Sequence, residues 1–300
     1  MKRVIVSGAS GFLGSQCVKQ LISRGYEIHA FSSQCQEPAH GIHWHTVDLC
    51  NYTETNGIVK SIGASHLLHL AWRVAHSGLW NALDNQPWVG ASINLLNAFR
   101  ESGGQRVVGV GSCGEYDWRQ GICVEGLTPT TPSTFYGVCK GAVRDVFMDI
   151  GQRTELSIAW ARPFFIYGPA EHQSRLVSNV IIALLKGEEA LCTHGKQVRD
   201  YMHVADVADG VVTLLDSSVE EVVNIASGET TSLRDIISTI GQQLDASHLI
   251  KLGARPAADH EPPMILGDTA KTQSLLGWQA SVSLQEGLKQ TIDWWRAELN

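Results

Sequence analysis

The strongest constraint on the fold is a glycine-rich loop near the start of the chain, where Gly8, Gly11 and Gly14 are spaced three apart. The loop follows a short β-branched run at 4–6. It precedes a segment, about 12–23, whose apolar residues recur at helical spacing. Glycines at a strand–helix junction permit a tight turn and let the backbone approach a pyrophosphate, which the free N–H groups of the helix start attract. This position predicts dinucleotide binding, although the spacing is GxxGxxG rather than GxGxxG and a simple tight turn is the alternative.

The first half of the chain alternates predicted strands and helices. Strands are expected at 27–31, 65–70, 106–110 and 156–161, and helices at 88–101 and 134–150. Strands separated by helices of this length imply a parallel sheet covered on both faces. After residue 163 the pattern loosens into helices at 177–185, 206–215, 233–244 and 284–298 with one strand at 222–226. We therefore predict an α/β fold. A doubly wound (Rossmann) parallel sheet is expected from 1–163 and 201–226, and a smaller, discontinuous substrate domain from 164–200 and 227–300.

Composition excludes several classes of protein. A net charge of −7 over 300 residues argues against nonspecific binding to nucleic acid or to an acidic membrane surface. No apolar run approaches the roughly 20 residues of a membrane helix, and the run at 4–6 is too short for a signal peptide. The seven cysteines are scattered without a CxxC pair, so no disulfide framework is indicated. We therefore expect a cytoplasmic protein.

Histidine pairs occur twice, at His43 and His45 and at His66 and His69. Their spacings suit a strand or helix face, but no third ligand is evident in the sequence. No metal site is predicted.

Three residues with complementary chemistry follow the loop along the chain. Tyr136 and Lys140 are four apart on a predicted helix and so share one face. An ammonium beside a phenol lowers the phenol pKa from its usual value near 10, which would make Tyr136 a general acid or base near neutral pH. Ser112 follows the predicted strand at 106–110, at the carboxyl edge where ligands bind in open α/β sheets. A Tyr-x-x-x-Lys pair alone is common on helix surfaces, but this order of elements predicts a hydride-transfer site with Ser112, Tyr136 and Lys140 as catalytic residues.

The end of the second predicted strand bears on the choice of cofactor. An acidic residue there would bind the adenosine ribose and repel a 2′-phosphate, but the position falls near Ser32 and Ser33. NADP is therefore favoured over NAD, which stays the alternative. The residues expected to contact the dinucleotide are Gly8, Ser10, Gly11, Phe12, Leu13, Gly14, Ser32, Asp48, Leu49, Ala71, Tyr136, Lys140 and Pro163.

Motifs along nearly the whole chain resemble the extended short-chain dehydrogenase/reductase family of nucleotide-sugar epimerases, dehydratases and reductases. They lie at 8–14, 112–116 (SCGEY), 136–140 (YGVCK), 162–169 (RPFFIYGP), 199–204 (RDYMHV), 224–228 (NIASG) and 276–278 (LGW). The resemblance implies a nucleoside diphosphate sugar as substrate, with Arg199 and Arg255 on the diphosphate, since a guanidinium fork suits phosphate oxygens. Surface pairing of Arg199 with Asp200 or Asp206 is the alternative. The resemblance also implies a homodimer formed through the helices at 88–101 and 134–150.

The chain departs from the family pattern directly after Ser112. Relatives that eliminate water carry an Asp-Glu pair at the positions that Cys113 and Gly114 occupy here, so dehydration is disfavoured. Cys113 is assigned to the substrate site, with a small buried residue as the alternative. Glu115 stands where an apolar residue is usual, and its role is open. Trp72, Trp80 and Trp88 are equally consistent with a wall of the substrate cleft and with core packing.

Two reactions remain after this comparison. The favoured one is NADPH-dependent reduction of a nucleoside diphosphate 4-keto (6-deoxy) sugar, with Tyr136 as the proton donor. The alternative is an NAD-dependent nucleotide-sugar 4-epimerase. A protein that only binds the dinucleotide is least favoured, because it would not need Ser112, Tyr136 and Lys140 together.

Overall fold

The computed structural model describes residues 2–73, 78–258 and 261–299. At its centre lies a seven-stranded sheet in the order β3-β2-β1-β4-β5-β7-β12, in which every pairing is parallel. The strands are β1 (Arg3–Ser7), β2 (Glu27–Ser32), β3 (Ile42–Thr46), β4 (His66–His69), β5 (Arg106–Val110), β7 (Ser157–Pro163) and β12 (Val222–Ile225). The order of addition reverses between β1 and β4, which defines a doubly wound sheet with its ligand crevice at that point. The predicted fold class is confirmed.

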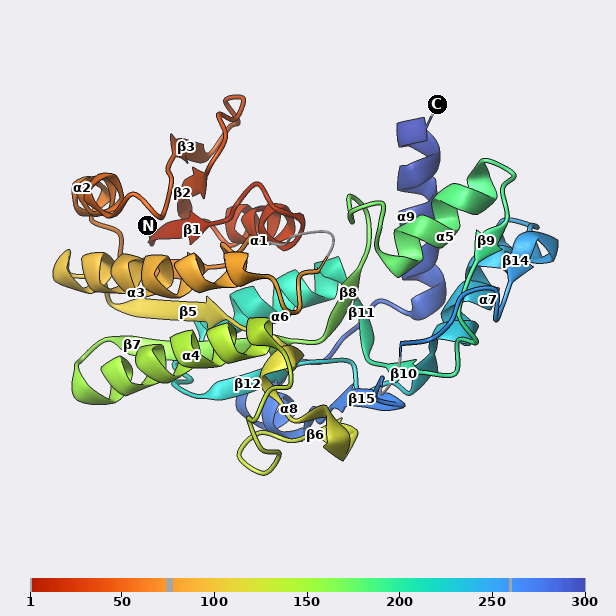
Figure 1. Ribbon diagram of the computed structural model, residues 1–300. Coiled ribbons are helices and arrows are strands. Elements are labelled where there is room, and N and C mark those ends of the chain that lie inside the picture. The colour runs from red at the N-terminus through yellow and green to blue at the C-terminus, as the bar shows by residue number, and fades with distance from the viewer. Residues whose placement is uncertain (1, 74–77, 259–260, 300) are drawn as a thin grey trace.

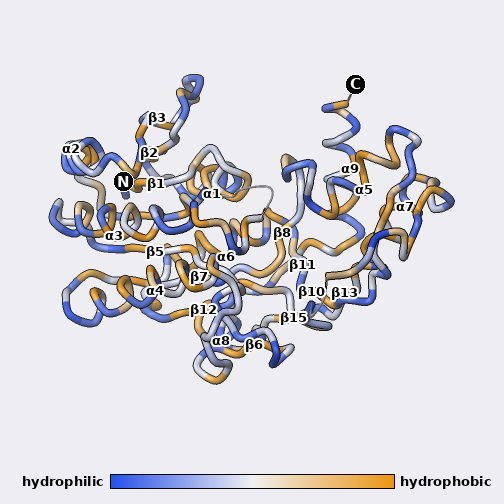
Figure 2. Tube along the Cα trace, in the orientation of Figure 1, coloured by the Kyte–Doolittle hydropathy of each residue, from blue (hydrophilic) through white to orange (hydrophobic). Residues whose placement is uncertain are grey.

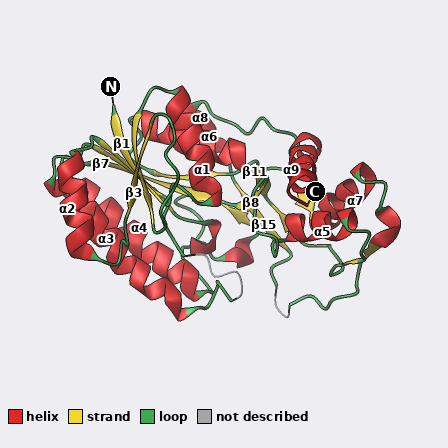
Figure 3. Cartoon of the chain, turned by 90° about the horizontal axis from the view of Figure 1, so that it is seen from above, coloured by secondary structure: helices red, strands yellow, loops and turns green. Residues whose placement is uncertain are grey.

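Helices cover both faces of this sheet (Figure 3). The helices α1 (Phe12–Ser23) and α6 (Val204–Asp216) pack on one face. The other face carries α2 (Tyr52–Ile62), α3 (Gln86–Glu101) and α4 (Phe135–Arg153). Because the inner strands β1, β5 and β7 are buried on both sides, they read as mostly apolar runs rather than as an alternating pattern.

Each face has its own apolar core (Figure 2). Leu21 of α1 and Val211 of α6 are fully buried on one side, and Leu95 of α3 and Phe147 of α4 on the other. Burying side chains of this size stabilises the fold by about 1.5–3 kcal/mol each. The two cores fix the positions of the carboxyl ends of the strands, where the candidate site described below lies.

A smaller lobe lies beyond the carboxyl edge of the sheet, at the right in Figure 1. Its strands are β8 (Phe165–Tyr167) with β11 (Tyr201–His203), β9 (Ala190–Leu191) with β14 (Ile250–Lys251), and the sheet β13 (Thr231–Ser232), β10 (Val198–Arg199), β15 (Met264–Gly267) and β6 (Ile122–Cys123). The helices α5 (Leu176–Leu185), α7 (Leu233–Gln243) and α9 (Leu284–Leu299) pack together around a third apolar core. A short helix, α8 (Ala270–Leu276), follows β15. Since β6 comes from the first half of the chain, the small sheet is built from segments far apart in sequence.

Several elements were not predicted from sequence, among them β3 and α2 of the central sheet and its helical layers. The edge strand β3 has only partly buried or exposed side chains, so its apolar signal is weak. The helix α2 contains Gly57, a poor helix former, and is held by its ends instead. The Asn51 side chain accepts a hydrogen bond from the amide of Glu54, and Gly63 closes the helix in the left-handed conformation at φ 59°. Over the described ranges, none of the helices has the length and apolarity that a bilayer crossing requires.

Candidate active site

The glycine loop lies where β1 passes into α1, and close contacts require glycine at two of its positions. A Cβ on Gly8, at φ +72°, would lie 2.8 Å from the Cα of Ala71, which follows the neighbouring strand β4. A Cβ on Gly14 would overlap the carbonyl oxygen of Gly8. No side chain caps α1 and no acidic residue lies in its first turn, so its N-terminal amides face the cleft without an internal anion. This arrangement fits a dinucleotide pyrophosphate.

A cleft of about 740 Å³ runs along the carboxyl ends of the strands. It is lined by all of the residues predicted to contact the cofactor, namely Gly8, Ser10, Gly11, Phe12, Leu13, Gly14, Ser32, Asp48, Leu49, Ala71, Tyr136, Lys140 and Pro163. Ser112 and Cys113 line the same cleft. The fold therefore brings the predicted cofactor residues and the predicted catalytic residues into one cavity.

The end of β2 carries hydroxyls where many dinucleotide folds carry an acid. The Ser32 hydroxyl accepts hydrogen bonds from the hydroxyl of Ser10 at 3.0 Å and from the amide of Gln34 at 3.1 Å. Asp48, just after the next strand, is exposed and accepts the amide of Cys50 at 2.9 Å. The edge of the cleft beside β2 is thus polar but uncharged at Ser32.

Ser112 begins a tight turn, η2 (Cys113–Glu115), directly after β5. Its hydroxyl accepts the amide of Gly114 at 3.1 Å, while its own amide donates to the Glu115 carboxylate at 2.9 Å. This turn packs against the start of α4, where a Cβ on Gly137 would overlap the carbonyl oxygen of Gly114. The serine is therefore held against the helix that carries Tyr136 and Lys140.

Tyr136 lies between two indole rings. Its ring centroid is 6.1 Å from that of Trp72 and 5.6 Å from that of Trp80, both in edge-on geometry, and its amide donates to the carbonyl of Trp80 at 2.9 Å. Trp88 also lines the cleft. The structure thus places Trp72, Trp80 and Trp88 on the cleft wall, an outcome that the sequence left open.

Lys140 is 4% exposed and reaches under the cleft toward the sheet. Its ammonium donates to the carbonyl oxygen of Val110 at 2.9 Å and lies 4.1 Å from the centroid of the Trp72 ring. Burial lowers the pKa of Lys140 to about 7, an effect that the negative charge of Glu115 opposes.

The predicted effect of Lys140 on Tyr136 is not what the structure shows. Burial raises the pKa of Tyr136 above its usual value, and the opposing influences are a hydrogen bond with Ser112 and the charge of Arg175. Sharing a helix face does not bring the lysine ammonium to the phenol, because that ammonium bonds to β5 instead. A phenol with a raised pKa is protonated near neutral pH, which suits it to donate a proton.

The two arginines predicted for a diphosphate lie outside the residues that line this cleft. Arg199 is paired with the Glu261 carboxylate at 2.8 Å, and not with Asp200 or Asp206, the partners considered from sequence. Those two aspartates accept hydrogen bonds from other segments: Asp200 from residues 227, 228 and 267, and Asp206 from residues 281 and 282. Arg255 is exposed, and its amide donates to the carbonyl of Cys192. Their roles stay predictions.

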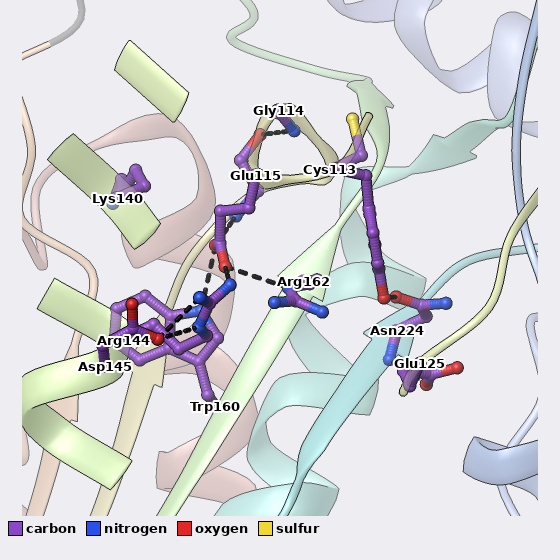
Figure 4. Close-up of polar contacts among 12 residues, drawn as sticks. Cys113, Gly114, Glu115, Glu125, Lys140, Arg144, Asp145, Trp160, Arg162 and Asn224 are labelled. Atoms are coloured by element: carbon purple, nitrogen blue, oxygen red, sulfur yellow. Dashed lines mark hydrogen bonds and ion pairs between the residues drawn. The ribbon is translucent and has the colours of Figure 1, made fainter. Parts of the chain in front are cut away.

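Cys113 is buried, and burial raises the pKa of its thiol, so it is not a thiolate base. It still borders the cleft. Glu115, whose role the sequence left open, is not among the residues that line the cleft, and its carboxylate points into a buried polar network (Figure 4).

One carboxyl group in the cleft was missed at the sequence level. Glu171, after β8, is 4% exposed and accepts the Ser178 hydroxyl at 2.9 Å. Burial raises the pKa of Glu171 to about 7. No sequence signal marks this residue, because its surroundings come from distant segments such as α9, whose Trp295 indole donates to Ser178 at 3.0 Å.

The histidines at the sheet edge have more neighbours than the sequence suggested. Parallel pairing of β2 with β3 sets His29 beside His43, and ligand atoms of Glu27, His29 and His43 lie within 4.8 Å of one another. Arg3 also donates to the Glu27 carboxylate at 2.9 Å, which places a competing positive charge there. The absence of a resident metal stays a prediction.

Comparison with known proteins agrees with this geometry. A family model described as the NAD dependent epimerase/dehydratase family matches residues 4–226. UDP-glucuronic acid decarboxylase 1 of Xenopus tropicalis is 26% identical over 320 residues, which cover 99% of this chain and 73% of that protein. UDP-glucose 4-epimerase of Mycolicibacterium smegmatis is 24% identical, with 98% of each chain covered.

Solved structures show the same fold. The structure of MoeE5 in complex with UDP-glucose and NAD matches with a TM-score of 0.88 at 28% identity, covering 99% of this chain and 100% of that one. UDP-glucose 4-epimerase of Thermotoga maritima with UDP-glucose matches with a TM-score of 0.89 at 21% identity, with the same coverage. The fold and the site define an enzyme of the extended short-chain dehydrogenase/reductase class, as the sequence motifs predicted. Within that class, the chain belongs to the NAD dependent epimerase/dehydratase family.

Proposed function

We propose that this enzyme moves a hydride reversibly at C4 of a nucleoside diphosphate sugar, as a 4-epimerase that keeps NAD bound. One observation carries the proposal: Ser112, Tyr136 and Lys140 border the same cleft as the glycine loop. Further relatives and structures are named as UDP-glucose or UDP-glucuronate 4-epimerases, and several of those structures contain NAD. They support both the reaction and the cofactor.

The chain's own residues supply the proton chemistry. Bound nicotinamide provides reversible hydride acceptance at the sugar carbon. For the oxidation step Tyr136 must first release its own proton to solvent; the phenolate then takes the proton of the C4 hydroxyl and the phenol returns it during reduction, while the Ser112 hydroxyl donates a hydrogen bond to the same oxygen. Lys140, which lines the same cleft, would hold the cofactor ribose when the dinucleotide is bound. The indoles of Trp72 and Trp80 exclude water around the phenol.

The second candidate is an NADPH-dependent 4-ketoreductase for a 4-keto 6-deoxy sugar. Two observations favour it. Ser32 places no acid where a 2′-phosphate would lie, and the raised pKa of Tyr136 keeps the phenol in its proton-donating form. One relative, from Aggregatibacter actinomycetemcomitans, is named dTDP-6-deoxy-L-talose 4-dehydrogenase (NAD(+)) at 23% identity. That name places a 4-dehydrogenase of a 6-deoxy sugar among the relatives.

The substrate's diphosphate belongs near Arg199 and Arg255 in this proposal, at the small lobe. Cys113, at the cleft edge beside Ser112, contacts the sugar. We also propose that the enzyme is a homodimer through α3 and α4, following the sequence resemblance.

A single assay separates these reactions. The purified enzyme is incubated with UDP-glucose, UDP-galactose and UDP-glucuronate, and the products are resolved by chromatography while cofactor absorbance is recorded. The epimerase is supported by interconversion of C4 epimers with no net absorbance change. The reductase is supported by NADPH consumption with a nucleoside diphosphate 4-keto 6-deoxy sugar. No conversion in any arm rejects both.

Ser32→Asp tests the cofactor assignment independently. An acid at this position repels a 2′-phosphate, so the variant's KM for NADPH rises while its affinity for NAD is kept or improved. If the wild-type enzyme does not bind NADPH at all, Ser32 does not make room for the 2′-phosphate, and the proposal of a reductase loses its main support.

A further inference from the structure

Glu115 is the most enclosed carboxylate next to the catalytic residues, with 1% of its surface exposed. Its two oxygens divide four donors between them (Figure 4). Oε1 accepts the Ser112 amide at 2.9 Å and the Trp160 indole at 3.0 Å. Oε2 accepts Nη1 of Arg144 at 3.1 Å and Nε of Arg162 at 2.9 Å. A carboxylate accepts about this many bonds when its lone pairs are satisfied.

We propose that Glu115 is the positioning residue for Ser112, fixing the serine backbone to α4 and β7 so that its hydroxyl is held beside Tyr136. This inference rests on the proposed function. Glu115 itself is not placed to touch the substrate, because it is not among the residues that line the cleft and its carboxylate bonds to Arg144, Trp160 and Arg162 instead.

The geometry connects three elements through one side chain. Arg144 belongs to α4, one turn after Lys140 and two turns after Tyr136 on the same helix. Arg162 belongs to β7, and its guanidinium lies 4.3 Å from the centroid of the Tyr116 ring. The hydrogen bond from the Ser112 amide to Glu115 connects the end of β5 to α4 and to β7. A displacement of the turn relative to the helix would therefore break a charge-assisted bond in a site sealed from water.

Space around the carboxylate is equally restrictive. A Cβ on Gly111, the residue before Ser112, would overlap both Glu115 Oε1 and Trp160 Nε1. Only glycine at this position lets the chain pass over the carboxylate and deliver Ser112 to the cleft. The charge balance is also local, since Arg144 has a second partner in Asp145 at 2.6 Å. The negative charges of Glu115 and Asp145 together balance the positive charges of Arg144 and Arg162.

The test compares Glu115→Gln with Asp145→Asn. The amide of the introduced glutamine offers one oxygen in place of two, so either the Ser112 contact or the arginine contacts are lost. We expect kcat to fall about 10- to 100-fold, the size of effect that a misplacement near 1 Å produces, while the KM for the sugar nucleotide and the Kd for NAD stay nearly constant. Asp145→Asn removes an exposed carboxylate from the same, largely buried arginine without changing any contact of Ser112, and we expect kcat to stay within about twofold.

A double-mutant cycle distinguishes positioning from general loss of stability. In a Ser112→Ala background, Glu115→Gln should add almost nothing to the loss of kcat, because its effect passes through the serine. Additive losses would overturn the proposal.

Glu115→Asp guards against a misfolded glutamine variant. It keeps the negative charge, but its carboxylate is one methylene shorter and cannot reach the Ser112 amide and the two buried guanidiniums at the same time. Amide hydrogen exchange at Ser112, measured on the whole protein, then provides a readout besides activity. We expect faster exchange in Glu115→Asp and unchanged exchange in Asp145→Asn.

Unchanged exchange and unchanged kcat in both Glu115 variants would refute the role of Glu115. A wild-type enzyme that converts no sugar nucleotide would instead refute the proposed function, and the exchange measurement would still decide the inference.

Discussion

The two sides of the cleft are built differently. The dinucleotide side is mostly backbone: glycines pressed against Ala71 and against each other, at the uncapped start of a helix. The opposite side is lined by long side chains from the small lobe, such as Arg175, while Arg199, the arginine predicted for the diphosphate, lies outside that lining and is paired with Glu261. A close backbone contact needs glycine at one position, so it can be predicted from a short stretch of sequence. An ion pair between segments that are far apart in the sequence cannot be predicted in this way.

The sharpest test of the catalytic half is Tyr136→Phe. Removing the hydroxyl takes away the proton donor and acceptor, and we expect kcat to fall about 10²- to 10⁴-fold while NAD still binds. Steady-state turnover and NAD titration measure the two effects. Turnover that survives at the wild-type level would remove the phenol from the mechanism.

Glu171 tests the buried carboxyl that faces the cleft from the small lobe. Its pKa is raised from 4.5 to about 7 in the folded protein, so the native state keeps a proton that the unfolded chain loses. Stability therefore falls as pH rises from about 4.5 to 7 through this group. Glu171→Gln should abolish that loss and stabilise the protein above pH 7 by up to about 3 kcal/mol.

Denaturant unfolding at several pH values measures this difference. The exposed Glu188→Gln serves as the control and should show no such trend. If the unfolding free energies of the two variants had the same pH dependence, burial would not raise the pKa of Glu171.

Gly14→Ala tests the backbone side. The new Cβ would overlap the Gly8 carbonyl, so we expect a loss of about 1–3 kcal/mol in unfolding free energy and weaker NAD binding. Gly57→Ala, in α2, is the matched control: a Cβ there meets no atom within 4 Å, and the change should stabilise by about 0.5–1 kcal/mol. Calorimetry and NAD titration of both variants report the contrast, which disappears if the loop can shift freely.

The smallest expected effect is at Glu261. If its carboxylate competes with a diphosphate for Arg199, Glu261→Gln should tighten binding of UDP by about two- to fivefold, the range for a partly exposed ion pair. Arg199→Ala should weaken binding of the same nucleotide. Calorimetric titration with UDP measures both, and an unchanged Kd in Glu261→Gln would mean that the pair does not compete.

The sequence was sufficient for features with a local signal. The glycine loop, the strand-end serine and the Tyr-Lys pair are each defined by short spacing, and the parallel sheet follows from alternating elements. Partners separated along the chain were out of reach: Glu115 meets Arg144 and Arg162 at separations of 29 and 47 residues. The expected effect of Lys140 on the phenol was wrong for a related reason. Helical spacing fixes a shared face but not how deep each side chain reaches.

The strand β6 has a practical consequence for exchanging parts between relatives. Ile122 and Cys123 pair with Leu266 and Gly267 of the small lobe, and they lie only a few residues after the turn that holds Ser112. A transplanted lobe would therefore meet a foreign strand unless β6 travelled with it, with the crossover placed after Glu115 so that the turn holding Ser112 stays intact. Chimeras that swap specificity at this fold need a second crossover inside the first half of the chain, or they will disturb the serine they are meant to preserve.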